Sequence, residues 1–210
     1  MTPRIGYRSV ALLRLADLAS RPPAIRAAQQ YRLAVLAGAA LDEARVPPER
    51  CRAHPGPDHL LLVADHSPFA MVTDFVRVLD EHLRESEAGY RPEHALRLIV
   101  AIDHGLVAER DGYPADDVVR RCDRLAREPA AEAQPAALVV VIADHFHRAV
   151  VRQGHRGIDP SSYAPLPDGT ARIRVLGAPA TQLPTPAGTR RVTLQDAREM
   201  LRELGDPPDH

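Results

Sequence analysis

Short aliphatic runs alternate along this chain with longer stretches in which apolar residues recur every three or four positions. The short runs predict buried strands, and the longer stretches predict amphipathic helices. We therefore predict strands at 10–15, two within 51–65, and others at 96–109, 138–142 and 170–176, with helices at about 20–44, 68–84, 116–127 and 144–151. The first part of this order, β-α-β-β-α-β, is the ferredoxin-like pattern.

The predicted fold class is α/β (α+β), with a ferredoxin-like βαββαβ core and extra C-terminal strands and helices. A length of 210 residues suits one domain with a tail better than two domains. Aromatic residues make up only 4% of the chain, so its core must be built from Leu, Val, Ile and Ala. Because several strands look interior, we expect a central sheet whose one face is covered by helices.

Charge and hydropathy exclude two classes of partner. The formal net charge is -1 and every basic residue is arginine, so the basic excess of a nucleic-acid-binding protein is missing. No apolar run approaches the roughly 20 residues that span a bilayer, so we expect neither a membrane nor a nucleic acid as partner. Cys51 and Cys122 stand outside any metal-ligand spacing, which favours reduced thiols and a cytoplasmic location.

Several phrases, in this order, resemble the class III nucleotidyl (adenylate/guanylate) cyclase homology domain, in particular its divergent actinobacterial-type members. They are Tyr7-Arg8-Ser9-Val10, the turn around Gly56, Arg97 to Gly105, Asp117 to Leu125, and Leu138 to Phe146. The resemblance implies a cyclase-like domain over 5–178. It leaves a Pro-rich linker and a short amphipathic helical tail over 179–210, with Leu194, Ala197, Leu201 and Leu204 at helical spacing.

The family's chemistry, as the resemblance implies it, uses two divalent cations held by one aspartate on the first strand and another at the hairpin tip. Here the first position falls on Arg14 and the second on Pro57. Arginine brings a permanent positive charge, and the proline ring offers no oxygen to a hard cation. We therefore expect a catalytically degenerate domain, with no metal cofactor.

A shifted register gives a different site. Asp17 follows Arg14 by three positions and Asp58 follows Pro57 directly, so these two carboxylates form the alternative metal pair for Mg²⁺ or Mn²⁺. The chain would then be an active cyclase that makes a cyclic nucleotide from a nucleoside triphosphate. The local interpretation is that Asp17 lies near a helix start and that Asp58 bonds turn backbone.

The transition-state positions implied by the family are mixed. Its asparagine aligns with Arg120, a departure, and its arginine aligns with Arg124, a match. Arginine stabilises phosphate charge, so Arg14 and Arg124 are the candidate nucleotide-binding residues. Arg124 also lies in an arginine-rich stretch, where it has an ordinary surface role as the alternative.

The expected function is non-catalytic signalling or regulation. The partner is a second copy, in a homodimer, or another cyclase-like or regulatory protein, in a heterodimer; a nucleotide is a further candidate ligand.

Two other constellations are weaker. His145 and His147 flank Phe146 at a predicted helix start, where side chains two apart diverge. Asp103 and His104 form a dyad with no accompanying nucleophile motif.

Overall fold

A computed structural model describes residues 4–87, 90, 94–110, 113–114, 116–154 and 157–179. The predicted linker and tail helix lie outside these residues, apart from the end of the last strand. The strands are β1 (Arg4–Leu15), β2 (Cys51–Pro55), β3 (His59–Ala64), β4 (Leu98–Arg110), β5 (Tyr113–Pro114), β6 (Ala136–Ala143), β7 (Ala164–Pro165) and β8 (Ala171–Pro179).

The strands form one sheet in the order β2-β3-β1-β4-β6-β8-β7, with β5 paired to β4. The first four strands in sheet order, β2-β3-β1-β4, are antiparallel neighbours, and β4 pairs with β6 in parallel. This is the ferredoxin-like arrangement, extended by β6, β8 and β7. The predicted fold class is therefore confirmed.

The helices are α1 (Pro23–Glu43), α2 (Pro68–Ala70), α3 (Val76–Glu87), α4 (Asp117–Ala126), α5 (Pro129–Glu132) and α6 (Asp144–Phe146). Three short 3₁₀ turns are η1 (Leu18–Ser20), η2 (Pro48–Arg50) and η7 (Pro160–Ser162). Two predicted single helices each contain a π-helical turn, namely η3 (Met71–Phe75) between α2 and α3, and η5 (His147–Val151) after α6. Single π-helical turns occur inside otherwise α-helical stretches, and five residues are too few for the different period to show in the apolar spacing, so the sequence predicted plain helices there.

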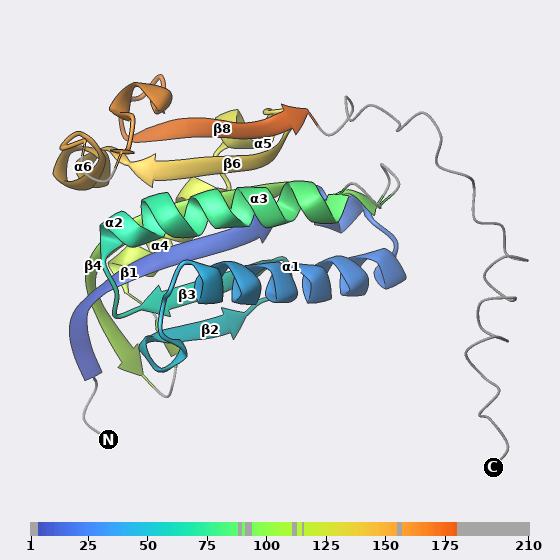
Figure 1. Cartoon of the computed structure of the whole chain (residues 1–210), viewed down its shortest axis with the longest axis horizontal. Coiled ribbons are helices and arrows are strands. Elements are labelled where there is room, and N and C mark those ends of the chain that lie inside the picture. The colour runs from blue at the N-terminus through green and yellow to red at the C-terminus, as the bar shows by residue number, and fades with distance from the viewer. Residues whose placement is uncertain are drawn as a thin grey trace, which may run out of the picture.

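Helices lie on both faces of the sheet, which corrects the expectation of one covered face. Figure 1 shows α1 and α3 in front of the central strands and α4 behind them. On the α4 side, a Cβ at Gly105 of β4 would press on Val118, and the thiol of Cys122 reaches the carbonyl of Val10. Successive side chains of a strand point to opposite faces of the sheet, so neighbouring residues of these strands face different helices.

The core is aliphatic, as the composition predicts. Its largest fully buried side chains include Leu12, Leu13, Leu61, Leu79 and Phe75. Helix α1 begins with Pro23 at its first position, where a missing N–H costs nothing. Its C-cap, Ala44, is followed by a left-handed residue, Arg45, with φ of 56°, at a position where glycine is more usual.

Among the described residues, none of the helices combines the length and apolar character needed to cross a bilayer.

Candidate functional site

Arg14 lies near the end of β1, and its side chain faces the C-terminal end of α4. Its Nε is 3.3 Å from the Oδ2 of Asp58, and its Nη1 donates to the carbonyl oxygen of Ala126 over 3.1 Å. The same guanidinium pairs with the carboxylate of Glu132 in α5. A cation at the last carbonyl of a helix is favoured by the helix dipole. Arg14 thus joins the β2–β3 turn to α4 and α5.

Asp58 follows the hairpin tip and is surrounded by donors. Its carboxylate accepts from Arg14, from Nη1 of Arg127 at 3.1 Å, and contacts Nδ1 of His59 at 2.9 Å. Burial raises the pKa of Asp58, but the hydrogen bonds from His59, Arg127 and Arg14 outweigh it, and the pKa lies below its usual value. Asp58 is therefore an ion-pair partner here, beyond the local turn role that the sequence indicated.

The hairpin tip itself is held to α1. The backbone carbonyl of Pro57 accepts a hydrogen bond from the side chain of Gln30, and the N–H of Gly56 donates to the carbonyl of His59 over 2.8 Å. The imidazole of His59 packs over Gly56, where a Cβ would collide with it. The side chain of Pro57 supplies no polar atom to this region.

Asp17 lies just beyond β1 in a left-handed conformation, with φ of 59°. The side chain of Asp17 is 51% exposed, and its carboxylate pairs with Arg97, which precedes β4. Arg97 also donates to the carbonyls of Glu132, at 2.9 Å, and Gln134, at 2.8 Å. The two carboxylates of the alternative metal pair, Asp17 and Asp58, are therefore each held by different arginines.

Four arginines lie along or just after α4, and three of them have carboxylate partners. Arg120 pairs with Asp117, and Arg127 with Asp123 as well as Asp58. Arg121 reaches the fully buried Asp103 on β4, with an Nε–Oδ2 distance of 2.5 Å.

Arg124 differs from these three. It is exposed, and within the described part of the chain its guanidinium makes no ion pair with a carboxylate. Its positive charge is one of the smaller influences that lower the pKa of Asp168, after that residue's hydrogen bonds with Thr170. Arg124 lines a groove of about 320 Å³ with Arg120, Arg121 and Asp117.

A second, larger groove of about 540 Å³ lies between the β1–β3 pair, β5 and α4. Its apolar wall includes Leu12, Leu61 and Val119, and its polar groups include His59. Tyr113 lines it too and remains 49% exposed. The groove shares Arg120 with the arginine-lined groove, so the two adjoin on one side of the molecule.

The histidine pair does not converge. Nε2 of His145 lies 2.9 Å from Oδ1 of Asp103, whereas His147 is buried beside the ring of Tyr163. The backbone N–H of His104 also donates to Asp103. In the described part of the chain, no cluster of three or more His, Cys, Asp or Glu side chains is arranged to hold a metal ion.

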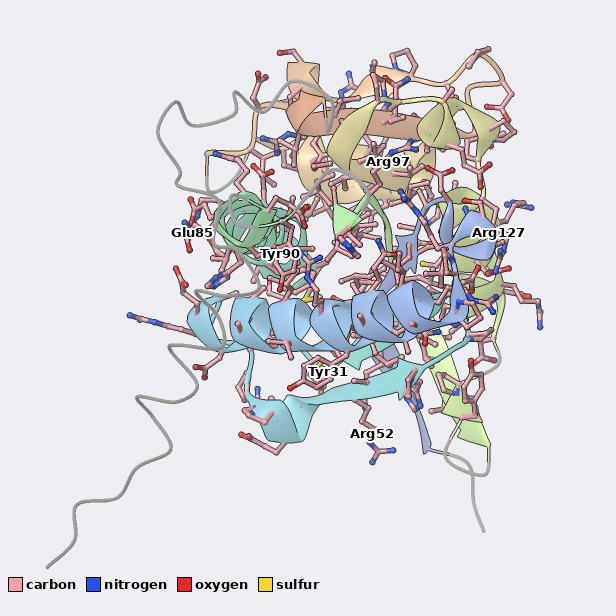
Figure 2. All side chains as sticks on the ribbon, turned by 90° about the vertical axis from the view of Figure 1, so that its right-hand side faces the viewer. Tyr31, Arg52, Glu85, Tyr90, Arg97 and Arg127 are labelled. Atoms are coloured by element: carbon pink, nitrogen blue, oxygen red, sulfur yellow. The ribbon has the colours of Figure 1, made fainter. Side chains whose placement is uncertain are left out.

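Sequence reasoning missed three residues of this network: Glu132, Arg97 and Arg127 in its role on Asp58. Glu132 lies 118 positions from Arg14, so no local spacing announces the contact. Figure 2 shows Arg97 and Arg127 in the same half of the molecule, both above α1 in that view.

The fold was compared with known proteins. No protein-family model matches the sequence, and no curated protein matches it. Solved structures do match. An adenylate/guanylate cyclase/hydrolase from Silicibacter pomeroyi has a TM-score of 0.61 at 14% identity, over 84% of this chain and 99% of that one.

Two further matches are similar in extent. A bacterial light-regulated adenylyl cyclase has a TM-score of 0.60 at 10% identity, over 87% of this chain and 56% of that one. The monomeric guanylyl cyclase domain of a rhodopsin fusion protein from the fungus Blastocladiella emersonii has a TM-score of 0.59 at 13% identity, over 84% and 99%. At these identities the likeness shows a shared fold.

Proposed function

We propose that this chain is a catalytically degenerate nucleotidyl cyclase homology module that acts in signalling or regulation, through dimerisation, partner binding or nucleotide sensing. Three observations support the proposal: the ordered resemblance of local phrases, the cyclase-like fold, and the ion pairs at the end of β1. The third carries the argument against catalysis.

The central observation is the contact between Arg14 and Asp58. Magnesium is bound in proteins by carboxylate oxygens in near-octahedral geometry. Here the Asp58 carboxylate is shared by the guanidinium groups of Arg14 and Arg127. A dication at this carboxylate would meet two fixed positive charges within a few ångströms, and the repulsion opposes binding.

The second candidate ligand, Asp17, is also paired, with Arg97. Loading a metal onto Asp17 and Asp58 together would require breaking ion pairs with three arginines. The residues present therefore fit a divalent cation poorly, and no catalytic step is assigned through one.

Nucleotide sensing rests on Arg124. An exposed guanidinium without a carboxylate partner in the described structure, in a groove lined by Arg120 and Arg121, suits a polyphosphate. Arg14 is a weaker candidate for the same role because its guanidinium already contacts Asp58, Glu132 and the Ala126 carbonyl. Arg124 is the residue that we propose contacts a nucleotide phosphate.

Association with a second cyclase-like chain is the other proposed activity. The groove of about 540 Å³ presents the exposed ring of Tyr113 and the partly buried Val119 beside polar groups, and the buried Leu12 and Leu61 complete its lining. Such a mixed surface matches the composition of protein interfaces, which combine aromatic residues with a polar rim. A homodimer or a heterodimer would use it.

The test of degeneracy is a product assay. The purified chain is incubated separately with ATP, GTP, CTP and UTP in the presence of Mn²⁺, and cyclic product is measured by chromatography. We expect none. Cyclic product that disappears in Asp17→Ala but persists in Asp42→Ala, an exposed aspartate near the end of α1, would establish the active cyclase with the Asp17 and Asp58 pair.

Nucleotide sensing is tested separately, without metal. Calorimetric titration with each triphosphate is repeated on Arg124→Ala and on Arg26→Ala, an exposed arginine of α1. We expect the dissociation constant to rise about tenfold in Arg124→Ala, because one charge-assisted phosphate contact is worth roughly 1.4 kcal/mol or more. Equal affinity in the two variants would remove Arg124 from the proposal.

A further inference from the structure

The outward face of α1 is apolar, although it has no covering element among the described residues. Tyr31 is 73% exposed and Val35 is 52% exposed, and both project from the middle of the helix. Exposed alanines continue this face on both sides of them, and Gly38 leaves open space beyond it. Surface helices normally carry polar residues on this side.

The exposed residues follow a regular seam, which we call the α1 seam. Its members, at alternating spacings of four and three, are Ala24, Ala28, Tyr31, Val35 and Gly38. This spacing is the one by which two helices pack side by side, with apolar knobs from one entering holes on the other. Figure 2 shows Tyr31 on the flank of α1 turned away from α3 and Tyr90. The seam is therefore separate from the α1–α3 contact.

The C-terminal segment carries a matching pattern. Leu194, Ala197, Leu201 and Leu204 have spacings of three, four and three, the same as Ala28, Tyr31, Val35 and Gly38. The other residues between Leu194 and Leu204 are charged or polar, apart from Met200. A helix with this pattern has one apolar stripe to bury.

We propose that residues 193–204 pack as a helix on the α1 seam of the same chain, parallel to α1. In that direction the sizes of the side chains are complementary in three of the four facing pairs, and the fourth, Leu201 with Val35, joins two aliphatic side chains. Leu194 and Leu204 would face the small residues Ala28 and Gly38, and Ala197 would face Tyr31. Alternation of large and small residues across facing positions is how helices interdigitate.

The connection begins at the end of the molecule where α1 starts. β8 ends at Pro179, which lies opposite Ala136. This is the end of the sheet at which β1 also ends and from which the chain turns toward the start of α1. Figure 1 shows the end of β8 and the start of α1 at the same end of the molecule. The stretch 180–192 can extend to about 40 Å at roughly 3.3 Å per residue, which allows the parallel orientation.

Hydrogen exchange of the full-length chain, followed by mass spectrometry, tests the contact. In the unaltered protein the amides of 194–204 should exchange at least tenfold more slowly than those of an unstructured chain. The protection should be independent of protein concentration, because the contact lies within one molecule. Val35→Glu should abolish it, since the substitution places a charge in the middle of the seam.

The matched control is Leu106→Glu on β4. Leu106 is 53% exposed, against 52% for Val35, and it lies outside α1. It should leave the protection intact. Leu201→Glu keeps a good helix former in the tail but removes the apolar contact, so it should also abolish protection.

Three results would overturn the proposal: unprotected tail amides in the unaltered protein, protection that survives Val35→Glu, or protection that appears only at high concentration. The last would identify a second copy as the occupant. None of these outcomes depends on nucleotide binding or cyclase activity, so this contact stands or falls independently of the proposed function.

Discussion

The guanidinium of Arg14 lies 3.3 Å from the carboxylate of Asp58, although 44 positions separate the two residues in the chain. The antiparallel register of β1 and β3 creates this contact, because it sets Arg14 opposite His59, the neighbour of Asp58. The pair lies in a region of intermediate burial, with Arg14 15% and Asp58 26% exposed at the side chain. Such a position makes the pair relevant to stability as well as to metal binding.

Replacing Arg14 with alanine should destabilise the fold by about 1–2 kcal/mol, since it removes charge-assisted bonds to Asp58 and Glu132 and the bond to the Ala126 carbonyl. The figure is discounted because Glu132 is 44% exposed and solvent screens that pair. Urea unfolding followed by circular dichroism measures it. Arg26→Ala, a change at an exposed α1 position, should stay within about 0.5 kcal/mol. An equally stable Arg14→Ala protein would show that the network adds nothing.

Acid should weaken the fold partly through Asp58. Its folded-state pKa is lowered, so its contribution to stability is fully present above the unfolded value of about 3.9 and is lost as the pH falls through the folded pKa. As the pH drops below about 4, the urea concentration at the unfolding midpoint should therefore decrease, and the decrease should be less steep in Asp58→Asn. Arg127→Ala should also flatten the decline, because it removes one of the donors that lower the pKa. A slope unchanged in both variants would contradict this assignment.

Both cysteines should resist alkylation in the folded protein. Burial raises the pKa of Cys51 to about 11, so at pH 8 only about a thousandth of it is thiolate. Burial raises the pKa of Cys122 well above its usual value too, and its side chain is inaccessible. Mass spectrometry after iodoacetamide treatment should show labelling of Cys51 about 100-fold slower than that of a free thiol. Denaturation in urea should allow both to react; rapid native labelling would refute the prediction.

Asp103 should matter more to stability than any exposed aspartate. It is fully buried and holds Arg121 at 2.5 Å and His145 at 2.9 Å. Asp103→Ala leaves the guanidinium of Arg121 and the imidazole of His145 without their acceptor, which should cost about 2 kcal/mol, less than a fully buried pair because both partners are partly exposed. Asp103→Asn keeps acceptor and donor atoms and should cost about half as much. Chemical denaturation of the three proteins tests the order, and equal losses would point to packing alone.

The order of strands and helices could be predicted from apolar spacing because each long element buries one face or both. β5 and β7 escaped prediction because two residues are too short to show a period. The α4 helix was predicted, but its position on the second face was not, because helical spacing specifies which side is buried and not which sheet face receives it.

The sequence by itself determined which chemical groups stand at the critical positions: a guanidinium at 14, a proline ring at 57, and carboxylates at 17 and 58. Only the tertiary structure decided which of these groups meet. Strand register carried Arg14 to Asp58, and the packing of α4 and α5 added Arg127 and Glu132. Side-chain identity is local to each residue, whereas an ion pair depends on the distance between groups that folding alone brings together.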